Sequence, residues 1–511
     1  LNGFMTQNEY NSVLDNMRLP TGDVFTLPIN LPVTKDIAET FKIGEIICLK
    51  DEQQYTLAHL EISDIYAPDL ENECIKAYGT TDDNHPYVKI VMNRKNIVYI
   101  GGQVTIVQLP KHLDFNDIRL TPAQTKEYFS KNKWDIVVGF QTRNPMHRSH
   151  YELTKYALNK VGDNAKLLLH PTVGITQSCD IEYHTRVKCY QEIIKKYDQD
   201  KILLSLLPLT MRMAGPREAV LHALIRRNYG CTHFIIGRDH AGPSYKSKTG
   251  KSFYDPYGAQ KLAKELEGEL KIKIVESVNI VYVKELGKYL PENEIPDGMT
   301  ILNISGTQQR EMLNNNQQIP EWFTYKEIYE ILKKTFIADD KIGFCLYFVG
   351  LSGSGKSTHA EACLNRLKEL LPERPVTLLD ADVIRQNLSK GLGFSKEDRS
   401  TNVRRIGYVA SEIVKHHGIV LVANIAPYKE DRDYNNDIIS AYGQYYEIFV
   451  DTNIDECEKR DSKGLYKLAK DGKIKNFTGI SDPFETPETP NILIDGTANL
   501  LENVDKIINK L

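Results

Sequence analysis

A glycine-rich stretch in the last third of the chain has the pattern of a phosphate-binding loop. Gly350–Ser357, read as GLSGSGKS, fits GxxxxGK[ST], and it follows an apolar run and opens a helical pattern, which is the context such a loop requires. Glycines allow backbone N–H groups to surround phosphates, Lys356 supplies positive charge, and the hydroxyl of Ser357 can bind Mg²⁺. The stretch therefore predicts a site for a nucleoside triphosphate with its Mg²⁺.

Residues further along indicate what accepts the phosphoryl group. Asp380 follows a second apolar run, so its carboxylate is expected at the cleft, where it can orient or deprotonate a hydroxyl. The segment 393–405 combines several cations with Phe394. This set suits an anionic acceptor that carries a base, although a solvated charged helix has a similar composition.

Two histidines in the middle third form a second candidate site. His147 and His150 belong to QTRNPMHRSH (141–150), between an apolar run and a helical pattern. At a helix start both can face one phosphate, and the helix N-terminus favours an anion. Imidazoles there can stabilise charge on a pentavalent α-phosphorus without acting as nucleophiles. Zinc is the rival ligand for such a pair, but no convincing third ligand accompanies it, so no zinc is predicted.

A third cluster, GRDHAGP (237–243), again follows an apolar run. Arg143 and Arg238 could meet across a cleft and hold a dianion and a triphosphate, because a guanidinium donates to two oxygens at once. Either arginine alone would more often be a surface ion-pair partner.

The elements that must position these residues follow from the apolar runs. Residues 1–121 have a strand-rich pattern, with runs at 24–33, 43–49, 55–62, 87–92 and 97–109, the last interrupted by Gly101-Gly102. From about residue 122, strands are predicted at 135–140, 165–170, 202–209, 233–236 and 272–275, and helices at 151–161, 186–197, 217–229 and 259–270. This alternation predicts a parallel, doubly wound sheet with ligands at the carboxyl ends of its strands.

A further α/β unit follows a linker at 335–341. Its predicted strands are 342–349, 376–379, 419–422, 446–450 and 491–494, with helical stretches between the first four.

The net charge, the apolar runs and the cysteine content indicate which kinds of partner and which cellular environment suit the chain. The 511 residues carry a net charge of −4, which argues against a nucleic acid partner. No apolar run reaches the ~18 residues that a membrane span needs. Eight cysteines without a CxxC pair fit a reducing cytoplasm. No signal peptide is seen, and the first residue is Leu1, so we expect the natural N-terminus to be missing.

The last third resembles the adenylylsulfate kinase family. The resemblance covers about 340–511 and rests on LLDADVIR, GLGFSKEDRSTNVRRIG, IAPYKEDRD, RDSKGLYKLA and KIKNFTGISDPFE. It implies transfer of the γ-phosphoryl of ATP to the 3′-hydroxyl of adenosine phosphosulfate, with Asp380 at that hydroxyl. The implied ATP contacts are Gly350, Ser352, Gly353, Ser354, Gly355, Lys356, Ser357 and Thr358. The implied adenylyl sulfate contacts are Asp382, Arg385, Phe394, Arg399, Asn402, Ile425, Lys463 and Phe477.

Two positions depart from that family. Ala426 stands where members often carry the serine linked to a phosphoenzyme, so direct in-line transfer is predicted. Asn476 replaces the usual glycine before Phe477, which bears on how closely the backbone can approach the ligand.

The first two-thirds, Leu1 to about Leu332, resemble the ATP sulfurylase family. The resemblance rests on LNGFMTQNEYNSVLDNMRLPTG, QTRNPMHRSH, LLHPTVG, DIEYHTRVKCYQEII, LPLTMRMAGPREAVLHALIRRNYG, GRDHAGP, LNISGTQQR and IPEWFTY. It implies Gln141, Arg143, Gly237, Arg238, Asp239, His240 and Ile280 as ATP contacts. It also implies Arg143 and Ala241 at sulfate, a catalytic loop with Thr142 and Asn144, and a transition state stabilised by His147 and His150.

Together the resemblances imply a multidomain α/β enzyme. The expected domains are a PUA-like, β-rich, barrel-like N-terminal domain (1–121), a Rossmann-like sulfate adenylyltransferase domain (122–336) and a kinase domain with a phosphate loop and a parallel sheet (340–511). ATP and sulfate would give adenosine phosphosulfate and pyrophosphate, and the kinase would then form 3′-phosphoadenosine phosphosulfate. We expect Mg²⁺ with ATP, a homo-oligomer, and no membrane or nucleic acid partner.

Three alternatives compete with this reading. The last third could be a regulatory module that only senses the final product, although such modules tend to lose the phosphate loop that this chain retains. The sulfurylase could run backwards to make ATP. The two units could be an unrelated adenylyltransferase and an unrelated kinase.

Overall fold

The computed structural model describes residues 1–51, 54–112, 114–177, 180–315, 317–335, 342–461, 464–474 and 476–511. The chain divides into two compact units, one made of residues 1–313 and 317–335 and the other of residues 314–316 and 336–511. Residues 336–341, most of the predicted linker, lie outside the described residues. None of the helices in the described part combines the length and apolar character needed to cross a membrane.

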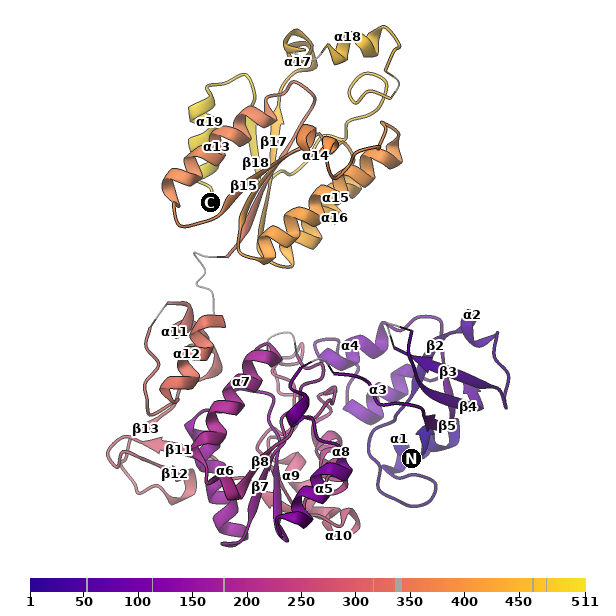
Figure 1. Ribbon diagram of the computed structural model, residues 1–511, viewed down its shortest axis with the longest axis vertical. Coiled ribbons are helices and arrows are strands. Elements are labelled where there is room, and N and C mark those ends of the chain that lie inside the picture. Colours follow the sequence, from indigo (N-terminus) through magenta and orange to yellow (C-terminus); the bar gives the residue numbers. More distant parts are fainter. Residues whose placement is uncertain are drawn as a thin grey trace. The chain divides into compact units, whose positions relative to one another are not determined.

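The first unit begins with an antiparallel sheet (Figure 1). Its long central strand β5 pairs with β4 on one side and with β1 and β2 on the other, while β3 pairs with β4. These strands pair as an open sheet, so the predicted strand-rich domain is present but its described strands do not close into a barrel. The elements are β1 (Gly3–Phe4), α1 (Gln7–Asn16), β2 (Leu31–Thr34), α2 (Lys35–Ala38), β3 (Ile46–Lys50), β4 (Thr56–Tyr66), α3 (Leu70–Tyr78), α4 (Pro86–Met92) and β5 (Ile97–Ile106).

One strand predicted in this region is wrong and another is only partly present. The run 87–92 is helix α4, because His85 caps its N-terminus, Pro86 occupies its first turn, and Val88 and Val91, three residues apart, face the core. The run 24–33 forms a strand only from Leu31 onward.

The glycine pair Gly101-Gly102 does not interrupt β5. A Cβ on Gly101 would lie 2.6 Å from the carbonyl oxygen of Met5, and one on Gly102 would lie 2.0 Å from that of Glu61. The pair therefore lets neighbouring backbone approach the strand closely.

A parallel five-stranded sheet forms the centre of the rest of the first unit. Its order is β10-β9-β6-β7-β8, with every pairing parallel, as predicted. The core lies between this sheet and α5, α8 and α9. The elements are α5 (Pro122–Lys131), β6 (Val137–Phe140), α6 (Arg148–Val161), β7 (Lys166–Leu169), α7 (Tyr183–Ile193), β8 (Ile202–Leu204), α8 (Gly215–Asn228), β9 (His233–Ile236), α9 (Gly258–Glu265), α10 (Glu267–Leu270) and β10 (Lys273–Glu276).

The first unit ends with a small antiparallel sheet and two helices. The sheet order is β12-β11-β13. The elements are β11 (Ile280–Val283), β12 (Lys288–Pro291), β13 (Ile301–Leu302), α11 (Gly306–Asn314) and α12 (Lys326–Thr335).

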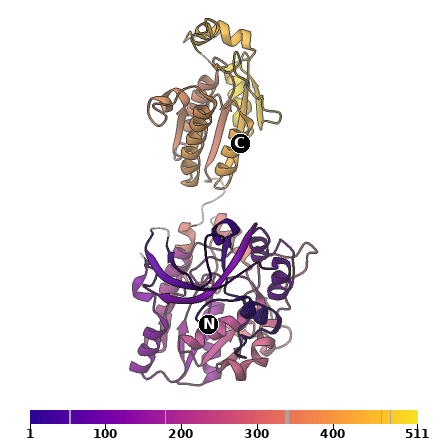
Figure 2. The same cartoon turned by 90° about the vertical axis from the view of Figure 1, so that its right-hand side faces the viewer.

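The second unit is a parallel sheet with helices on both faces (Figure 1, Figure 2). The order is β15-β16-β14-β17-β18. Alternate residues of β14 pack against α13 and α19 on one face and against α15 and α16 on the other, which explains its continuous apolar sequence. The elements are β14 (Phe344–Val349), α13 (Lys356–Leu370), β15 (Val376–Asp380), α14 (Ala381–Gln386), α15 (Lys396–Lys415), β16 (Ile419–Ala423), α16 (Lys429–Ser440), β17 (Gln444–Asp451), α17 (Ile454–Arg460), α18 (Leu465–Lys470), β18 (Ile492–Asp495) and α19 (Leu500–Ile508).

Two candidate active sites

The glycine-rich loop of the second unit connects β14 to the N-terminus of α13. Gly353 and Gly355 have φ of 78° and 102°, in the region that favours glycine. A Cβ on Gly353 would also lie 2.9 Å from the carbonyl oxygen of Cys457. Lys356, the first residue of α13, is largely buried, and its Nζ donates to the carbonyl oxygen of Leu351 at 2.6 Å. The loop and the helix N-terminus together make an anion site.

The predicted carboxylate lies directly beside this loop. Asp380 ends β15 and caps α14, with Oδ1 accepting from the backbone N–H of Asp382 at 2.9 Å. Its Oδ2 accepts from the hydroxyl of Ser357 at 2.6 Å. Hydroxyl and carboxylate oxygens are the ligands that Mg²⁺ prefers, so this pair fits the ion that accompanies a nucleotide.

Most residues predicted for this site line one cavity of about 750 Å³. The predicted residues among its lining are Ser352, Gly353, Gly355, Lys356, Ser357, Thr358, Asp380, Asp382, Arg385, Phe394, Arg399, Asn402, Ile425 and Phe477. Gly350 and Ser354 are not among the lining residues; Ser354 is buried, and its carbonyl oxygen accepts from the hydroxyl of Thr452. Lys463 lies outside the described residues. Sequence reasoning missed Asn424, Arg460 and Tyr466, which also line the cavity.

Aromatic and cationic groups surround the cavity as the acceptor would require. The guanidinium of Arg385 lies 4.8 Å from the ring centroid of Phe394, and the Phe477 ring packs against Tyr466. Arg399 is buried and contacts Thr478 and Asp482, each at 2.6 Å. These contacts fix the loop that carries Phe477.

Several buried polar atoms of side chains that line this cavity have no hydrogen-bond partner among the described residues, including Nδ2 of Asn424. The Oδ1 atom of Asn402 is buried and accepts no hydrogen bond from the described residues. A buried acceptor left in this state is costly unless a ligand or water uses it.

The structure gives physical reasons for both departures from the kinase family. Asn476 has φ of 58°, a left-handed conformation that asparagine tolerates better than most residues, so the turn before Phe477 survives without glycine. Ala426 is fully buried and packs in the core between the sheet and α15. A side chain at this position faces the core.

The candidate site of the first unit lies where two neighbouring parallel strands end. β6 and β9 are paired through Val138–His233 and Gly139–Phe234. The loop 141–147 follows β6, and the loop 237–243 follows β9, so the two loops lie at the same edge of the sheet. This is the crevice where the strand order reverses, the usual ligand position in such sheets. Gln141 is buried there, and its Oε1 has no partner among the described residues.

The two histidines flank the start of α6. His147 caps the helix, and its backbone N–H donates to Nδ1 of His150 at 3.2 Å. Nδ1 of His147 contacts the hydroxyl of Thr324 at 3.1 Å, and its ring packs on Phe323. Because Nδ1 of His150 is an acceptor, its proton lies on Nε2 and can be donated to a phosphate oxygen.

Both imidazoles are uncharged. Burial, together with the charge that His150 would carry, lowers the pKa of His147 to about 3. Burial lowers the pKa of His150 to about 4. They can therefore stabilise a developing negative charge as neutral donors.

Arg143, the residue predicted to bind sulfate, forms an ion pair with Asp180, which the sequence analysis did not predict. Nη1 of Arg143 lies 2.6 and 2.7 Å from the two carboxylate oxygens of Asp180, and Nη2 donates to the hydroxyl of Ser244 at 3.2 Å. Ser244 follows the second loop, so Arg143 connects both loops. A bound dianion would share or replace Asp180 as its partner.

Helix α7 also holds the first loop, which sequence reasoning did not anticipate. Arg186 donates to the carbonyl oxygens of Arg143 and Thr172 at 2.9 and 3.0 Å. The hydroxyl of Tyr190 donates to the carbonyl oxygen of Asn144 at 2.9 Å. The contacts to Arg143 and Asn144 join residues 43 and 46 positions apart, which no local spacing reveals.

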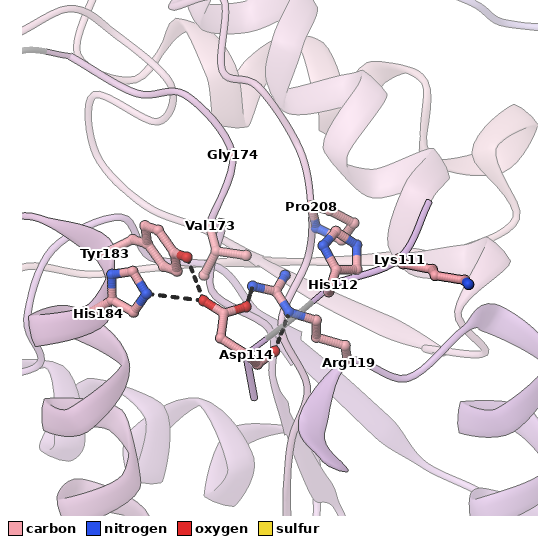
Figure 3. A pocket seen from close by; sticks show the side chains of 9 residues that line it. All are labelled: Lys111, His112, Asp114, Arg119, Val173, Gly174, Tyr183, His184 and Pro208. Atoms are coloured by element: carbon pink, nitrogen blue, oxygen red, sulfur yellow. Dashed lines mark hydrogen bonds and ion pairs between the residues drawn. The ribbon is translucent and has the colours of Figure 1, made fainter. Parts of the chain in front are cut away.

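The same helix is tied to the segment that enters the parallel-sheet region (Figure 3). The carboxylate of Asp114 contacts Tyr183, His184 (3.0 Å) and Arg119 (2.6 Å) beside a cavity of about 500 Å³. The first turn of α7 therefore contacts both Asp114 and the loop 141–147.

The loop after β9 holds the remaining predicted residues. Asp239 and Ala241 have φ of 52° and 58°, which turns the chain sharply between them. Arg238 and Asp239 are exposed and 3.5 Å apart, Gly237 begins the loop, and Ala241 packs with Met211 and Met213. Ile280 is placed differently: it is buried at the start of β11, in the small antiparallel sheet.

Thr142 shapes the first loop, because its hydroxyl accepts from the backbone N–H of Asn144 at 3.1 Å and donates to that residue's carbonyl oxygen at 3.0 Å.

Within the described residues, no group of three or more His, Cys, Asp or Glu side chains could hold a metal ion.

Profiles of three known families match the chain in succession. The PUA-like domain matches residues 1–109, ATP-sulfurylase matches 116–335, and adenylylsulphate kinase matches 342–495.

Several relatives match nearly the whole length of the chain. A sulfate adenylyltransferase of Gibberella zeae is 42% identical over 100% of this chain and 88% of its own length. One from Coccidioides immitis is 43% identical over 97% of this chain and 86% of its own length. The solved structure titled hexameric APS kinase from Thiobacillus denitrificans superposes with a TM-score of 0.76 at 32% identity, covering 100% of this chain and 88% of that one.

Proposed function

The chain belongs to the sulfate adenylyltransferase family, and from that premise we propose that it activates sulfate in two steps, one in each unit. The first unit joins sulfate to the adenylyl group of ATP, and the second phosphorylates the product. The main support for this proposal is the cavity of the second unit. It is lined by an intact phosphate loop, by Asp380 and by residues predicted to contact adenosine phosphosulfate.

In the first step a sulfate oxygen attacks the α-phosphorus of ATP, and the bond to pyrophosphate breaks. Sulfate is a poor nucleophile, so the site must act by positioning and by stabilising charge. Arg143 binds sulfate beside Ala241, and Nε2–H of His150 and the ring of His147 serve the α-phosphate. Gln141, Gly237, Arg238, Asp239 and His240 hold the nucleotide, and Thr142 and Asn144 shape the loop between them.

In the second step the 3′-hydroxyl of adenosine phosphosulfate attacks the γ-phosphorus of a second ATP, and ADP leaves. Asp380 accepts the hydrogen bond of that hydroxyl, Lys356 and the loop hold the phosphates, and Phe394 and Phe477 flank the base. Ser357 and Asp380 would hold Mg²⁺, which neutralises phosphate charge when bound. Ala426 offers no hydroxyl, so no phosphoseryl intermediate forms there.

The domain boundaries that fit this function are 1–121, 122–336 and 340–511. ATP, sulfate and adenosine phosphosulfate are the small-molecule substrates. We also propose a homo-oligomer, which the hexameric name of the full-length structural relative supports.

The main competing function is a sulfurylase with a product-sensing last domain. The curated relatives carry the name of the first activity, whereas the full-length structural relative carries the name of the second. The complete phosphate loop favours a working kinase.

A single assay separates these functions. Purified protein is incubated with Mg·ATP, labelled sulfate and pyrophosphatase, and the labelled nucleotides are resolved. We expect 3′-phosphoadenosine phosphosulfate to accumulate. Accumulation of adenosine phosphosulfate alone would support the sensor, and no labelled nucleotide would refute both. In parallel, γ-labelled ATP should leave no stable phosphoprotein.

A further inference from the structure

A buried chain of three side chains leads from α8 to the loop after β9. Glu218 and His222 lie one turn apart on α8, and Nε2 of His222 is 3.4 Å from Oε1 of Glu218. Nδ1 of His222 is 3.1 Å from Nε2 of His240. Glu218 and His222 are almost completely buried, whereas His240 is partly exposed at the nucleotide loop.

Glu218 is a fixed, ionised acceptor at one end of this chain. Its two oxygens accept from the backbone N–H groups of Arg212 and Ala214, each at 2.9 Å. Although burial opposes ionisation, the neighbouring imidazole of His222 and the hydrogen bonds from these N–H groups lower the pKa of Glu218.

Both histidines are neutral. Burial lowers the pKa of His222 despite the nearby Glu218, and the buried guanidinium of Arg226 acts in the same direction. Burial, His222 and Arg226 together lower the pKa of His240 well below its ordinary value.

The position of the ring proton of His222 determines the position of the ring proton of His240. A neutral imidazole has one N–H and one lone pair. Nε2 of His222 makes no hydrogen bond of good geometry, but the ionised carboxylate of Glu218 lies 3.4 Å from it and favours the tautomer with the proton on Nε2, which makes Nδ1 the acceptor. Nε2 of His240 must then be the donor, which leaves the lone pair of His240 on Nδ1. That atom has no partner among the described residues.

We propose that Glu218 and His222 are positioning residues that hold His240 as a hydrogen-bond acceptor for the nucleoside of ATP. This inference rests on the proposed adenylyl transfer at this site. The group recognised is an uncharged donor, either the 6-amino group of the base or a ribose hydroxyl. An analogue that lacks this donor leaves Nδ1 unpaired and binds less well.

The test compares two substitutions of His222 in the full chain. His222→Leu removes the acceptor for His240, whereas His222→Asn keeps an acceptor oxygen close to the position of Nδ1. Sulfate-dependent pyrophosphate release is measured with ATP, with the 6-oxo analogue ITP, and with 2′-deoxy- and 3′-deoxy-ATP. Wild type should disfavour the one analogue that lacks the recognised donor by about tenfold, the usual effect of one hydrogen bond.

His222→Leu should lose this discrimination, through KM for ATP more than through kcat, and His222→Asn should keep it. Unchanged discrimination in folded His222→Leu, or equal loss in both variants, would overturn the proposal. If the leucine variant fails to fold, ¹⁵N chemical shifts of the wild-type imidazoles report the tautomers directly, and a proton on Nδ1 of His240 would overturn it as well. Absence of sulfate-dependent turnover in wild type would refute the proposed function, while the ¹⁵N measurement would still decide the tautomer.

Discussion

The imidazoles at the start of α6, which the proposed function places at the α-phosphate, are held in defined orientations. Thr324 and Phe323 fix the ring of His147, and the backbone of His147 fixes the tautomer of His150. A neutral donor aimed at developing charge needs no reorganisation during the reaction. Its removal should therefore reduce turnover more than substrate binding.

We expect His147→Ala to lower sulfate-dependent pyrophosphate release by ~100-fold, the usual cost of losing one such donor. The rate is measured at saturating ATP and sulfate. His59→Ala, at an exposed position of β4 in the same unit, is the matched control and should behave as wild type. Near-normal turnover in folded His147→Ala would remove this residue from catalysis.

Arg143→Lys keeps a positive charge but loses the planar group that contacts Asp180 and Ser244 together. We expect KM for sulfate to rise by about tenfold or more, because hydrogen bonds to a charged ligand are lost. Steady-state kinetics with varied sulfate test this. Unchanged sulfate kinetics would show that Arg143 lies outside the sulfate site.

At the scale of elements, helix α7 holds the loop 141–147 in place. It contacts backbone carbonyl groups of that loop through Arg186 and Tyr190, and its own N-terminus is tied to Asp114 (Figure 3). The contacts of the helix with this loop thus go to backbone carbonyl groups.

Tyr190→Phe removes one hydroxyl and its hydrogen bond to the carbonyl oxygen of Asn144. We expect kcat/KM for sulfate adenylylation to fall by about fivefold to tenfold, and stability to fall by about 1 kcal/mol. Tyr151→Phe, which loses a comparable bond to the carbonyl oxygen of Lys196, should cost similar stability but little activity. Equal activity in the two variants would contradict the positioning role.

Sequence patterns predicted the two parallel sheets well because buried parallel strands are continuous apolar runs. Strand β9 matches its prediction at both ends. The apolar run 87–92 was predicted as a strand, but it forms a helix because His85 caps the helix N-terminus and Pro86 favours the first helical turn. Motifs indicated Arg143 and His147 as site candidates. They gave no sign of Asp180, Arg186 and Tyr190, since the contacts of these residues depend on folded segments far along the chain.

At the scale of the whole molecule, the two activities belong to units with separate cores. Lys356→Ala should abolish phosphorylation of adenosine phosphosulfate and spare its synthesis, because Lys356 serves only the second nucleotide site. With pyrophosphatase present, the variant should accumulate the intermediate. Loss of sulfate adenylylation as well would show that the units depend on each other.

Acid should destabilise the first unit more than the second. Burial lowers the pKa of eight histidines in the first unit (His85, His112, His147, His150, His170, His222, His233 and His240), but only of His417 among the described residues of the second. Below about pH 6.5, the ordinary pKa of histidine, the unfolded chain binds protons that the folded unit excludes. The stability of the first unit therefore decreases as the pH decreases.

At pH 5, His147 and His150 should each lower the free energy of unfolding by about 2 kcal/mol relative to pH 7. Both tryptophans, Trp134 and Trp322, lie in the first unit, so tryptophan fluorescence during urea unfolding reports on that unit alone. A midpoint that stays constant between pH 7 and pH 5 would contradict this expectation.

Because one polypeptide contains both units, every molecule synthesised supplies the producer and the consumer of the intermediate in equal number. Gene expression can raise or lower total flux but cannot change that ratio. The steady concentration of adenosine phosphosulfate is then set by the relative turnover of the two sites. A mutation that slows the second site cannot be offset by making more protein, since each new copy adds another source of the same intermediate.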